Sequence, residues 1–207
     1  MDNSNFQFPI HNFLFLFLWI LIGYLAGSIP TGYWLGKLKG IDLTKVGSGS
    51  TGATNVLRRI GKVAALITLL IDFSKGFFCV YFAIQLGFSP FIVSMIAIAC
   101  ILGHSKSIFL KFKGGKSSAT GLGILIAISW KVALITFIIW TLIVITSKYS
   151  SLGSIISIPL VPFWLYLFHK PLGYVFFTIF AAVYIVLIRH RENIKRLLSG
   201  TEPKVSV

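Results

Sequence analysis

Long apolar segments alternate with short polar segments along this chain. The first, from Phe13 to Ile29, carries no charge and is close to the roughly 20 helical residues that cross a bilayer. Pro30 then ends it, and the small, polar and basic stretch from Tyr33 to Lys62 predicts a long loop. Six further apolar segments follow, so we expect membrane-spanning helices at about 13–29, 63–86, 91–103, 117–129, 132–147, 152–168 and 172–189.

These segments predict an all-α integral membrane protein, a seven-helix transmembrane bundle with short polar cytoplasmic loops, folded as a single polytopic domain over residues 1–207. Segments 91–103 and 117–129 are short for a full crossing, so five crossings with these two as re-entrant halves is the alternative. We predict a tight turn at Trp130-Lys131, and Pro159 and Pro162 are expected to kink the segment that contains them.

The composition agrees with a membrane protein and indicates its orientation. Hydrophobic residues make up 56% of the 207 residues, charged residues 12%, and 19 Lys and Arg against five Asp and Glu give a net charge of +14. With Met1 outside, sixteen of the nineteen basic residues fall on the cytoplasmic side, as the positive-inside rule requires. The charge therefore indicates orientation and not nucleic-acid binding. The segment before Asn12 has no basic n-region, so the first span is expected to stay in the membrane.

A few polar or reactive residues lie inside apolar segments. Asp72 and Lys75 are three residues apart and so share a helix face, where we favour a mutually neutralising pair over a proton or substrate path. Cys79 and Cys100 lack metal or redox spacing and are interpreted as small core residues.

The stretch from Val46 to Asn55, VGSGSTGATN, contains only small side chains apart from its ends. Glycines let successive backbone N–H groups form a concave cluster, hydroxyls add donors, and Lys45 and Arg58 supply positive charge. Each glycine alone suits a turn, but four hydroxyl residues and an asparagine are more than a turn needs. We interpret the stretch as a phosphate site.

Two other polar elements fall on the same predicted face. One is the loop 104–118, with the sequence KFKGGKSSATG around Lys116, and the other is the start of the tail, where His190 and Asn193 are three residues apart. This face carries few carboxylates, the oxygen ligands that magnesium prefers, so anion binding without a metal is favoured over two-metal phosphotransfer. The carboxylates in question are Asp42, Glu192 and Glu202.

Familiar catalytic motifs are absent. Gly115-Lys116-Ser117 matches the end of a P-loop, but the position five residues before Gly115 is Leu110 and not glycine. No histidine has an aspartate five positions later, which excludes the acyltransferase mechanism that uses such a pair, and there is no serine elbow of the GxSxG type.

Three long runs, in order, cover much of the chain: GSIPTGYWLGKLKGIDLTKVGSGSTGATNVLR, GHSKSIFLKFKGGKSSATGLG and RHRENIKRLLSGTEPKV. They resemble the three signature motifs of the acyl-phosphate:glycerol-3-phosphate acyltransferases, the PlsY family of bacteria. The resemblance implies a plasma (inner) membrane enzyme that transfers a fatty acyl group from acyl phosphate to the 1-hydroxyl of glycerol 3-phosphate, giving lysophosphatidic acid and phosphate. It implies no cofactor, no metal and no covalent acyl-enzyme. Its partners would be the two substrates, membrane lipids and the acyl-phosphate-producing enzyme.

The resemblance also assigns residues. Catalytic positions are His190, Asn193 and Lys116; glycerol 3-phosphate would be bound by Ser48, Arg58 and Lys116; and the acyl-phosphate head by Thr54, Asn55, Gly115, Ser150, Ser151, His190 and Asn193. The general base is either His190, whose ordinary pKa lies near neutrality, or a substrate phosphate that His190 orients.

Structural alternatives accompany these assignments. Lys116 is otherwise one more cytoplasmic charge like Lys111 and Lys113, Ser150 and Ser151 otherwise cap a helix, and His104 is interpreted as structural. Headgroup contacts are expected for Arg59, Arg189, Arg191, Lys195 and Arg196.

The chain departs from the expected motifs at Ser50-Thr51 and Ser117-Ser118, which keep small polar character. The alternative function is an organic-anion transporter or channel, which would need ionisable residues or broken helices near the midplane. A non-catalytic scaffold would explain the charges but not the glycine-hydroxyl run.

Overall fold

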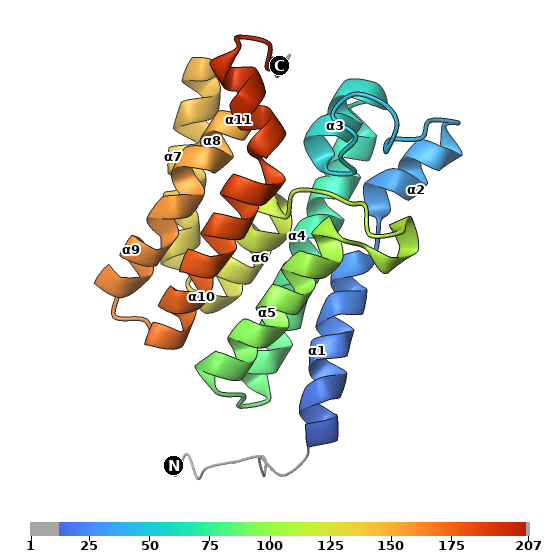
Figure 1. Cartoon of the computed structure of the whole chain (residues 1–207). Helices are drawn as coiled ribbons and strands as arrows, with labels where there is room; N and C mark the ends of the chain where they lie inside the picture. Colours follow the sequence, from blue (N-terminus) through green and yellow to red (C-terminus); the bar gives the residue numbers. More distant parts are fainter. Residues whose placement is uncertain (1–12, 206–207) are drawn as a thin grey trace.

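The protein is all-helical in the computed structural model, which describes residues 13–205 (Figure 1). The expectations for Met1 to Asn12, including an outside N-terminus, lie outside the described residues. The helices are α1 (Phe13–Ser28), α2 (Thr31–Leu38), α3 (Ala53–Arg59), α4 (Lys62–Gln85), α5 (Pro90–Ser105), η1 (Ile108–Leu110), α6 (Ser118–Ile128), α7 (Trp130–Ser147), α8 (Ser150–Ser157), η2 (Ile158–Leu160), α9 (Val161–Leu167), α10 (Leu172–Val183), η3 (Tyr184–Arg189) and α11 (Arg191–Leu198).

All seven apolar segments form helices close to the predicted bounds, which confirms the all-α fold. Within residues 13–205, five helical stretches are long and apolar enough to cross a membrane, whereas α5 and α6 are shorter. Seven full crossings therefore remain a prediction. The five stretches are Leu14–Leu38, Lys62–Gln85, Trp130–Ser147, Ser150–Leu167 and Leu172–Arg189.

Two local predictions were wrong. The loop predicted from Tyr33 to Lys62 contains most of α2 and the whole of α3. Pro30 lies between α1 and α2, so a new helix begins directly after the residue that was expected to begin the loop region. The turn predicted at Trp130-Lys131 is the first turn of α7, and the break lies at Ser129, whose backbone is extended with φ −162°. One extended residue is enough to reverse the chain there.

The predicted interruption near the two prolines is present. Pro159 lies in the 3-10 turn η2 and Pro162 in the first turn of α9, so the segment from α8 to α9 is helical but broken. A proline has no N–H to donate and its ring clashes with the preceding turn, which explains the break.

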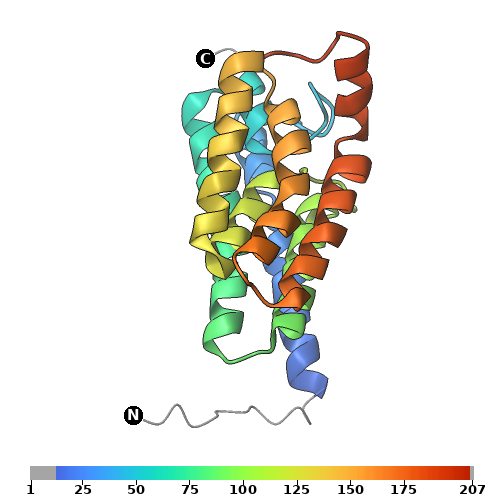
Figure 2. The same ribbon diagram turned by 90° about the vertical axis from the view of Figure 1, so that its left-hand side faces the viewer.

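Small residues allow the helices at the centre of the bundle to pack backbone to backbone. A Cβ atom at Gly76 of α4 would overlap the carbonyl oxygen of Thr120 in α6, and one at Gly123 of α6 would overlap that of Phe73. Gly27 brings α1 equally close to α5. Such close approach is typical of helix association in membranes, where lipid is as apolar as the side chains. Figures 1 and 2 show the helices bundled, with α3, α11 and the C-terminus at one end.

The charged pair in α4 forms as predicted. Lys75 Nζ lies 2.8 Å from Asp72 Oδ1 and donates to the carbonyl of Ile29 at 3.1 Å. His104 of α5 joins this buried cluster, with Nδ1 3.5 Å from the same carboxylate oxygen. Both cysteines are buried in the main apolar core, as predicted.

Candidate functional site

A cavity of about 410 Å³ lies at the end of the bundle that carries α3 and α11 and continues between the helices. Side chains from α3, α4, α6, α7, α8, α9 and α10, from the glycine-hydroxyl stretch and from the tail line it. Hydroxyl, amide and charged groups surround one end, which we call the polar end. The rest, which we call the apolar arm, is lined by residues that include Leu69, Leu125, Ile128, Trp140, Val161 and Phe177.

The cavity brings together most of the site residues that the sequence predicts. They come from four stretches that are far apart in the chain: the glycine-hydroxyl stretch with α3, the loop before α6, the start of α8 and the start of the tail. Gly115 is the exception, since it does not line the cavity. The predicted residues at the polar end are Ser48, Thr54, Asn55, Arg58, Lys116, Ser150, Ser151, His190 and Asn193.

Asn55 shapes the glycine-hydroxyl stretch from inside. Its Nδ2 donates to the carbonyl oxygens of Ser50 at 2.8 Å and Val46 at 3.2 Å, and its Oδ1 accepts from the N–H of Ser48 at 3.3 Å. Gly47 has φ +62°, and a Cβ atom there would overlap Asn55 Oδ1. The amide of Asn55 therefore fixes the fold of the stretch, a role that the sequence did not predict.

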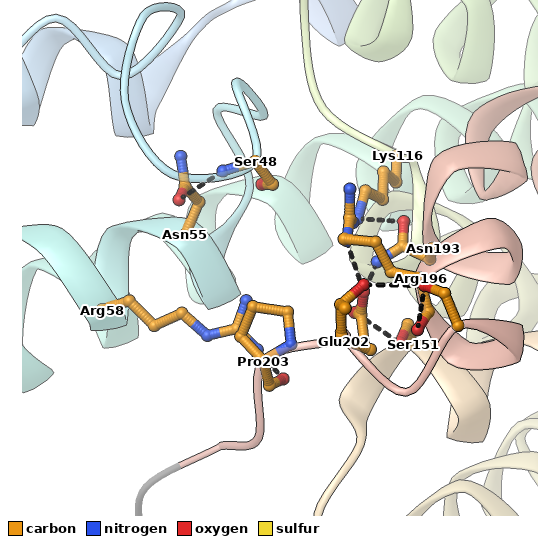
Figure 3. A network of polar contacts seen from close by, with 11 residues as sticks. Ser48, Asn55, Arg58, Lys116, Ser151, Asn193, Arg196, Glu202 and Pro203 are labelled. Atoms are coloured by element: carbon orange, nitrogen blue, oxygen red, sulfur yellow. Dashed lines mark hydrogen bonds and ion pairs between the residues drawn. The ribbon is translucent and has the colours of Figure 1, made fainter.

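A chain of hydrogen bonds crosses the polar end from the loop before α6 to the tail (Figure 3). Lys116 Nζ donates to Asn193 Oδ1 at 2.6 Å, and Asn193 Nδ2 donates to Glu202 Oε1 at 2.7 Å. The same carboxylate oxygen accepts from Ser151 Oγ at 2.7 Å, while Oε2 accepts from Arg196 Nε at 2.7 Å. Glu202 is therefore the centre of the network, and it holds α8 and α11 directly and the loop before α6 through Asn193.

The network sets the charge states of its members. Burial alone would raise the pKa of Glu202, but the hydrogen bonds from Ser151, Arg196 and Asn193 outweigh it and hold that pKa below its ordinary range. Burial lowers the pKa of Lys116 to about 8, with Glu202 acting in the opposite direction and Arg196 in the same direction. The polar end thus contains an ionised carboxylate beside an ammonium group that titrates close to neutral pH.

The C-terminal tail lies across the polar end. Arg58 Nη2 donates to the carbonyl oxygen of Pro203 at 2.8 Å, and the N–H of Val205 donates to the carbonyl oxygen of Lys148 at 2.8 Å. On the neighbouring wall, Thr54 Oγ1 and Ser150 Oγ are 3.3 Å apart. The tail, α3 and α8 are consequently fastened to one another around the cavity.

His190 follows the π-helical turn η3, which ends α10. Its Nδ1 lies 2.8 Å from the carbonyl oxygen of Ile185. A carbonyl can only accept, so Nδ1 carries the proton and Nε2 of the neutral ring is left as an acceptor. Burial lowers the pKa of His190 to about 4, and the charge of Lys116 acts in the same direction. His190 is therefore neutral at physiological pH.

Gly115 supports the site from behind the cavity wall. Its N–H donates to the carbonyl oxygen of His104 at 3.0 Å, and a side chain at Gly115 would overlap the His104 ring. Arg189 Nη2 donates to the carbonyl oxygen of Gly115 at 2.9 Å. Any side chain at this position would push the loop that carries Lys116 away from α5.

Three contacts were not anticipated from the sequence. Glu202 and Glu192 were each counted only as one of few carboxylates, but Glu202 is the centre of the network and Glu192 bonds the exposed Arg191. Arg189 and Arg196 were expected at lipid headgroups, but they bind the loop before Lys116 and Glu202 respectively. The signal for Glu202 was its position inside the third motif, in a tail with few other acidic residues.

A metal site finds no support in the described part of the chain. Residues 13–205 contain no cluster of three or more His, Cys, Asp or Glu side chains that are placed to hold an ion. Hydrogen-bond donors and cations dominate the polar end, and these bind anions.

Comparisons with known proteins agree with one another. The family model described as glycerol-3-phosphate acyltransferase matches residues 17–200. A glycerol-3-phosphate acyltransferase of Synechococcus sp. (strain JA-3-3Ab) is 49% identical over 184 residues, covering 88% of this chain and 90% of the relative. One of Thermotoga petrophila is 45% identical over 192 residues, covering 92% and 96%.

Two solved structures have the same fold as this chain. Both are crystal structures of PlsY, described as an integral membrane glycerol 3-phosphate acyltransferase. The glycerol 3-phosphate form is 38% identical with a TM-score of 0.88, covering 92% of this chain and 96% of that chain. The lysophosphatidic acid form is 37% identical with a TM-score of 0.85, covering 92% and 95%.

Proposed function

Because the chain belongs to the glycerol-3-phosphate acyltransferase family, we propose that this membrane enzyme acylates glycerol 3-phosphate to lysophosphatidic acid with acyl phosphate as donor. The observation that carries the proposal is the continuity of the cavity, in which a cationic, donor-rich end leads directly into an apolar arm. A phosphorylated head and a hydrocarbon chain on one molecule need these two environments side by side.

The polar end suits two phosphates. Ser48, Arg58 and Lys116 are the proposed ligands of glycerol 3-phosphate, because a hydroxyl, a guanidinium and an ammonium group form charge-assisted hydrogen bonds with phosphate oxygens. The proposed ligands of the acyl-phosphate head are the predicted residues that line the cavity, Thr54, Asn55, Ser150, Ser151, His190 and Asn193. Gly115 lies behind the wall, and its proposed role is to hold the loop that carries Lys116.

Catalysis on this proposal is direct transfer. The 1-hydroxyl oxygen attacks the acyl carbon, the bond between that carbon and the bridging phosphate oxygen breaks, and phosphate leaves with the bonding electrons. Lys116 and Asn193 position the phosphates, so no covalent acyl-enzyme, metal or cofactor enters. The mixed anhydride has a good leaving group, and positioning with charge stabilisation is the main task of the protein.

The hydroxyl proton goes to a phosphate oxygen. With a pKa of about 4, His190 is a weaker base than a phosphate monoester, whose second pKa is about 6. The Nε2 of His190 accepts a hydrogen bond and orients the hydroxyl, which makes His190 a positioning group. This favours the second of the two base assignments that the sequence left open.

The rival transporter finds little support. Asp72 and Lys75, the ionisable candidates for a midplane ion site, bind each other. The broken segment from α8 to α9 lines the apolar arm.

We place the enzyme in the bacterial plasma (inner) membrane with seven crossings, the N-terminus outside, and the polar end and C-terminus cytoplasmic. The distribution of Lys and Arg supports this orientation. Lipids and the acyl-phosphate-producing enzyme are the proposed partners beyond the substrates.

Purified protein tests the proposal. Given acyl phosphate and glycerol 3-phosphate, without metal or coenzyme A, it should release equal amounts of phosphate and lysophosphatidic acid. Failure to form either product, together with transport of one compound into proteoliposomes, would refute the enzyme and favour the transporter.

A matched pair of variants tests the site. Lys116→Ala should raise the KM for glycerol 3-phosphate by about 30-fold or more, because a buried charged hydrogen-bond partner is worth about 2–5 kcal/mol. Ser48→Ala should raise it less. Lys111→Ala, an exposed lysine in the same loop, should change it less than about threefold. Equal effects of the two lysine variants would mean that bulk charge and not a site binds the substrate.

A further inference from the structure

We propose that three side chains at the closed end of the apolar arm, Ile128, Val161 and Phe177, form a floor that sets the length of the acyl chain the enzyme accepts. We call these three residues the floor. The inference rests on the proposed function, because it assigns the apolar arm to the acyl chain.

Two elements fix the depth of the floor. Helix α6 leads from Ser118, two residues after Lys116, to Ile128, and the segment α8 to α9 leads from Ser151 to Val161. Each path is ten residues long, which corresponds to about 15 Å along α6 at about 1.5 Å per residue and to about 16–17 Å along α8 to α9, where the 3-10 turn η2 rises about 2 Å per residue. Independent paths on two elements thus reach similar depths.

The floor is backed by tightly packed core. The exposed fractions of Phe177, Val161 and Ile128 are 5%, 6% and 7%, while Leu165 and Val132, in the same apolar core, are fully buried at 0%. Because protein interiors have few voids, a chain cannot extend past Phe177 and Val161 without displacing core side chains. Ile128 separates the arm from a second cavity of about 250 Å³, which is also lined by Trp130 and Phe168.

The arm is also suited to hydrocarbon at its lower end. Thr136 and Thr178 line it, but their hydroxyls donate to the carbonyl oxygens of Val132 at 2.8 Å and Tyr174 at 3.0 Å, each one turn earlier. Those polar groups are satisfied within their own helices, so a chain that covers them leaves no hydrogen bond unmade.

The depth converts into a chain length. Tetrahedral carbons about 1.52 Å apart with angles of about 111° advance about 1.25 Å per atom, so about 15 Å holds about 12 carbons of an extended chain. Longer chains must turn sideways toward lipid between α4 and α7, where Leu66 and Phe137 line the cavity and are 56% and 47% exposed. Lipid is as apolar as the arm, so moving a chain from lipid into the arm changes the free energy little. The floor therefore discriminates between long and short acyl chains by shape.

The test is a chain-length profile. Acyl phosphates of 8 to 18 carbons are compared by kcat/KM in wild type, Phe177→Ala and Val161→Phe. Phe177→Ala should raise the ratio for 16-carbon over 12-carbon donors by about fivefold to tenfold, and Val161→Phe should lower it by a similar factor, as expected for relief or increase of overpacking. The matched control is Phe176→Ala, since Phe176 is 66% exposed on the same helix and should leave the profile unchanged.

A second readout keeps the inference separate from the choice of donor. Thermal protection by lysophosphatidic acids of the same chain lengths reports the arm whatever the acyl donor is. If wild type makes no product from any acyl phosphate, acyl phosphate is not the donor. If the chain length that protects best still differs between wild type and the two variants as expected, the floor is supported all the same. Identical profiles in wild type, Phe177→Ala and Val161→Phe would overturn the floor. If Phe177→Ala does not fold, Val161→Phe alone decides.

Discussion

Replacing Glu202 by glutamine removes one charge from the polar end without changing the shape of the side chain. In either orientation the amide nitrogen must face a group that can only donate there, Arg196 Nε or Asn193 Nδ2. Asn193 cannot turn its amide to help, because its Oδ1 already accepts from Lys116. Glu202→Gln therefore breaks the network wherever the new amide settles.

The magnitude follows from burial. The Glu202 side chain is only 3% exposed, so an unmatched donor and the lost ion pair with Arg196 together cost about 2–4 kcal/mol, at the lower end because the Arg196 side chain is 31% exposed. For a chain of about 200 residues this is a fall in Tm of about 5–10 °C. Turnover should fall at least about tenfold, because Lys116 and Asn193 lose the group that orients them.

Glu192→Gln is the control. Its carboxylate is 55% exposed and pairs with Arg191 at 3.1 Å and Lys195 at 3.8 Å, so its loss should cost less than about 1 kcal/mol. Thermal denaturation and phosphate release are measured for both variants in the same nanodiscs. Equal losses of Tm in the two variants, or full activity in Glu202→Gln, would refute the central role of Glu202.

The pH dependence of stability gives an independent check. The folded-state pKa of Glu202 is lowered, so its ionised form contributes stability above its unfolded pKa near 4.5, and this contribution is lost as pH falls through the folded pKa. Wild type should therefore lose more stability between pH 5 and more acidic conditions than Glu202→Gln does.

Three further predictions concern the same end of the bundle. The pKa of Lys116 is lowered to about 8, so the KM for glycerol 3-phosphate should rise with pH above about 8, by up to about tenfold per unit, and Lys116→Arg should abolish this rise in a KM-against-pH profile. Gly115→Ala should lower Tm and activity because the methyl group overlaps the His104 ring, whereas Gly121→Ala, where the nearest atom is 3.8 Å away, should keep or raise Tm; equal Tm values would contradict this. Dialysis against a chelator should leave phosphate release unchanged, and loss that added magnesium restores would contradict a metal-free mechanism.

The helices, and the residues of the polar end of the cavity, were predictable because both follow from local patterns in the sequence. Unbroken apolar runs specify helices in a bilayer regardless of neighbours, and the bounds of α1 and α4 differ from prediction by one residue. Local signals failed where one residue decides the outcome, as at Ser129, where a single extended residue separates α6 from α7.

Candidate site residues were predictable as types, since glycine, hydroxyl and basic residues in runs indicate anion binding before any contact is known. What those residues touch was not. Ser151 and Glu202 are 51 residues apart in the chain, and nothing in the sequence indicates that their side chains form a hydrogen bond of 2.7 Å. Only the packed bundle brings the tail over α8, and only then does a carboxylate that looked incidental become the shared acceptor of three donors.

The sequence by itself therefore determined the membrane class, the helical segments and the runs that make up the polar end, because hydropathy and composition act over short stretches. The tertiary structure alone decided that Gly115 supports the loop from behind, that Arg189 and Arg196 bind protein groups, and that one cavity joins the polar end to the apolar arm. Each of these features depends on contacts between segments that are distant in the chain. The polar groups involved are buried only when those segments pack together, so no single segment indicates the contacts.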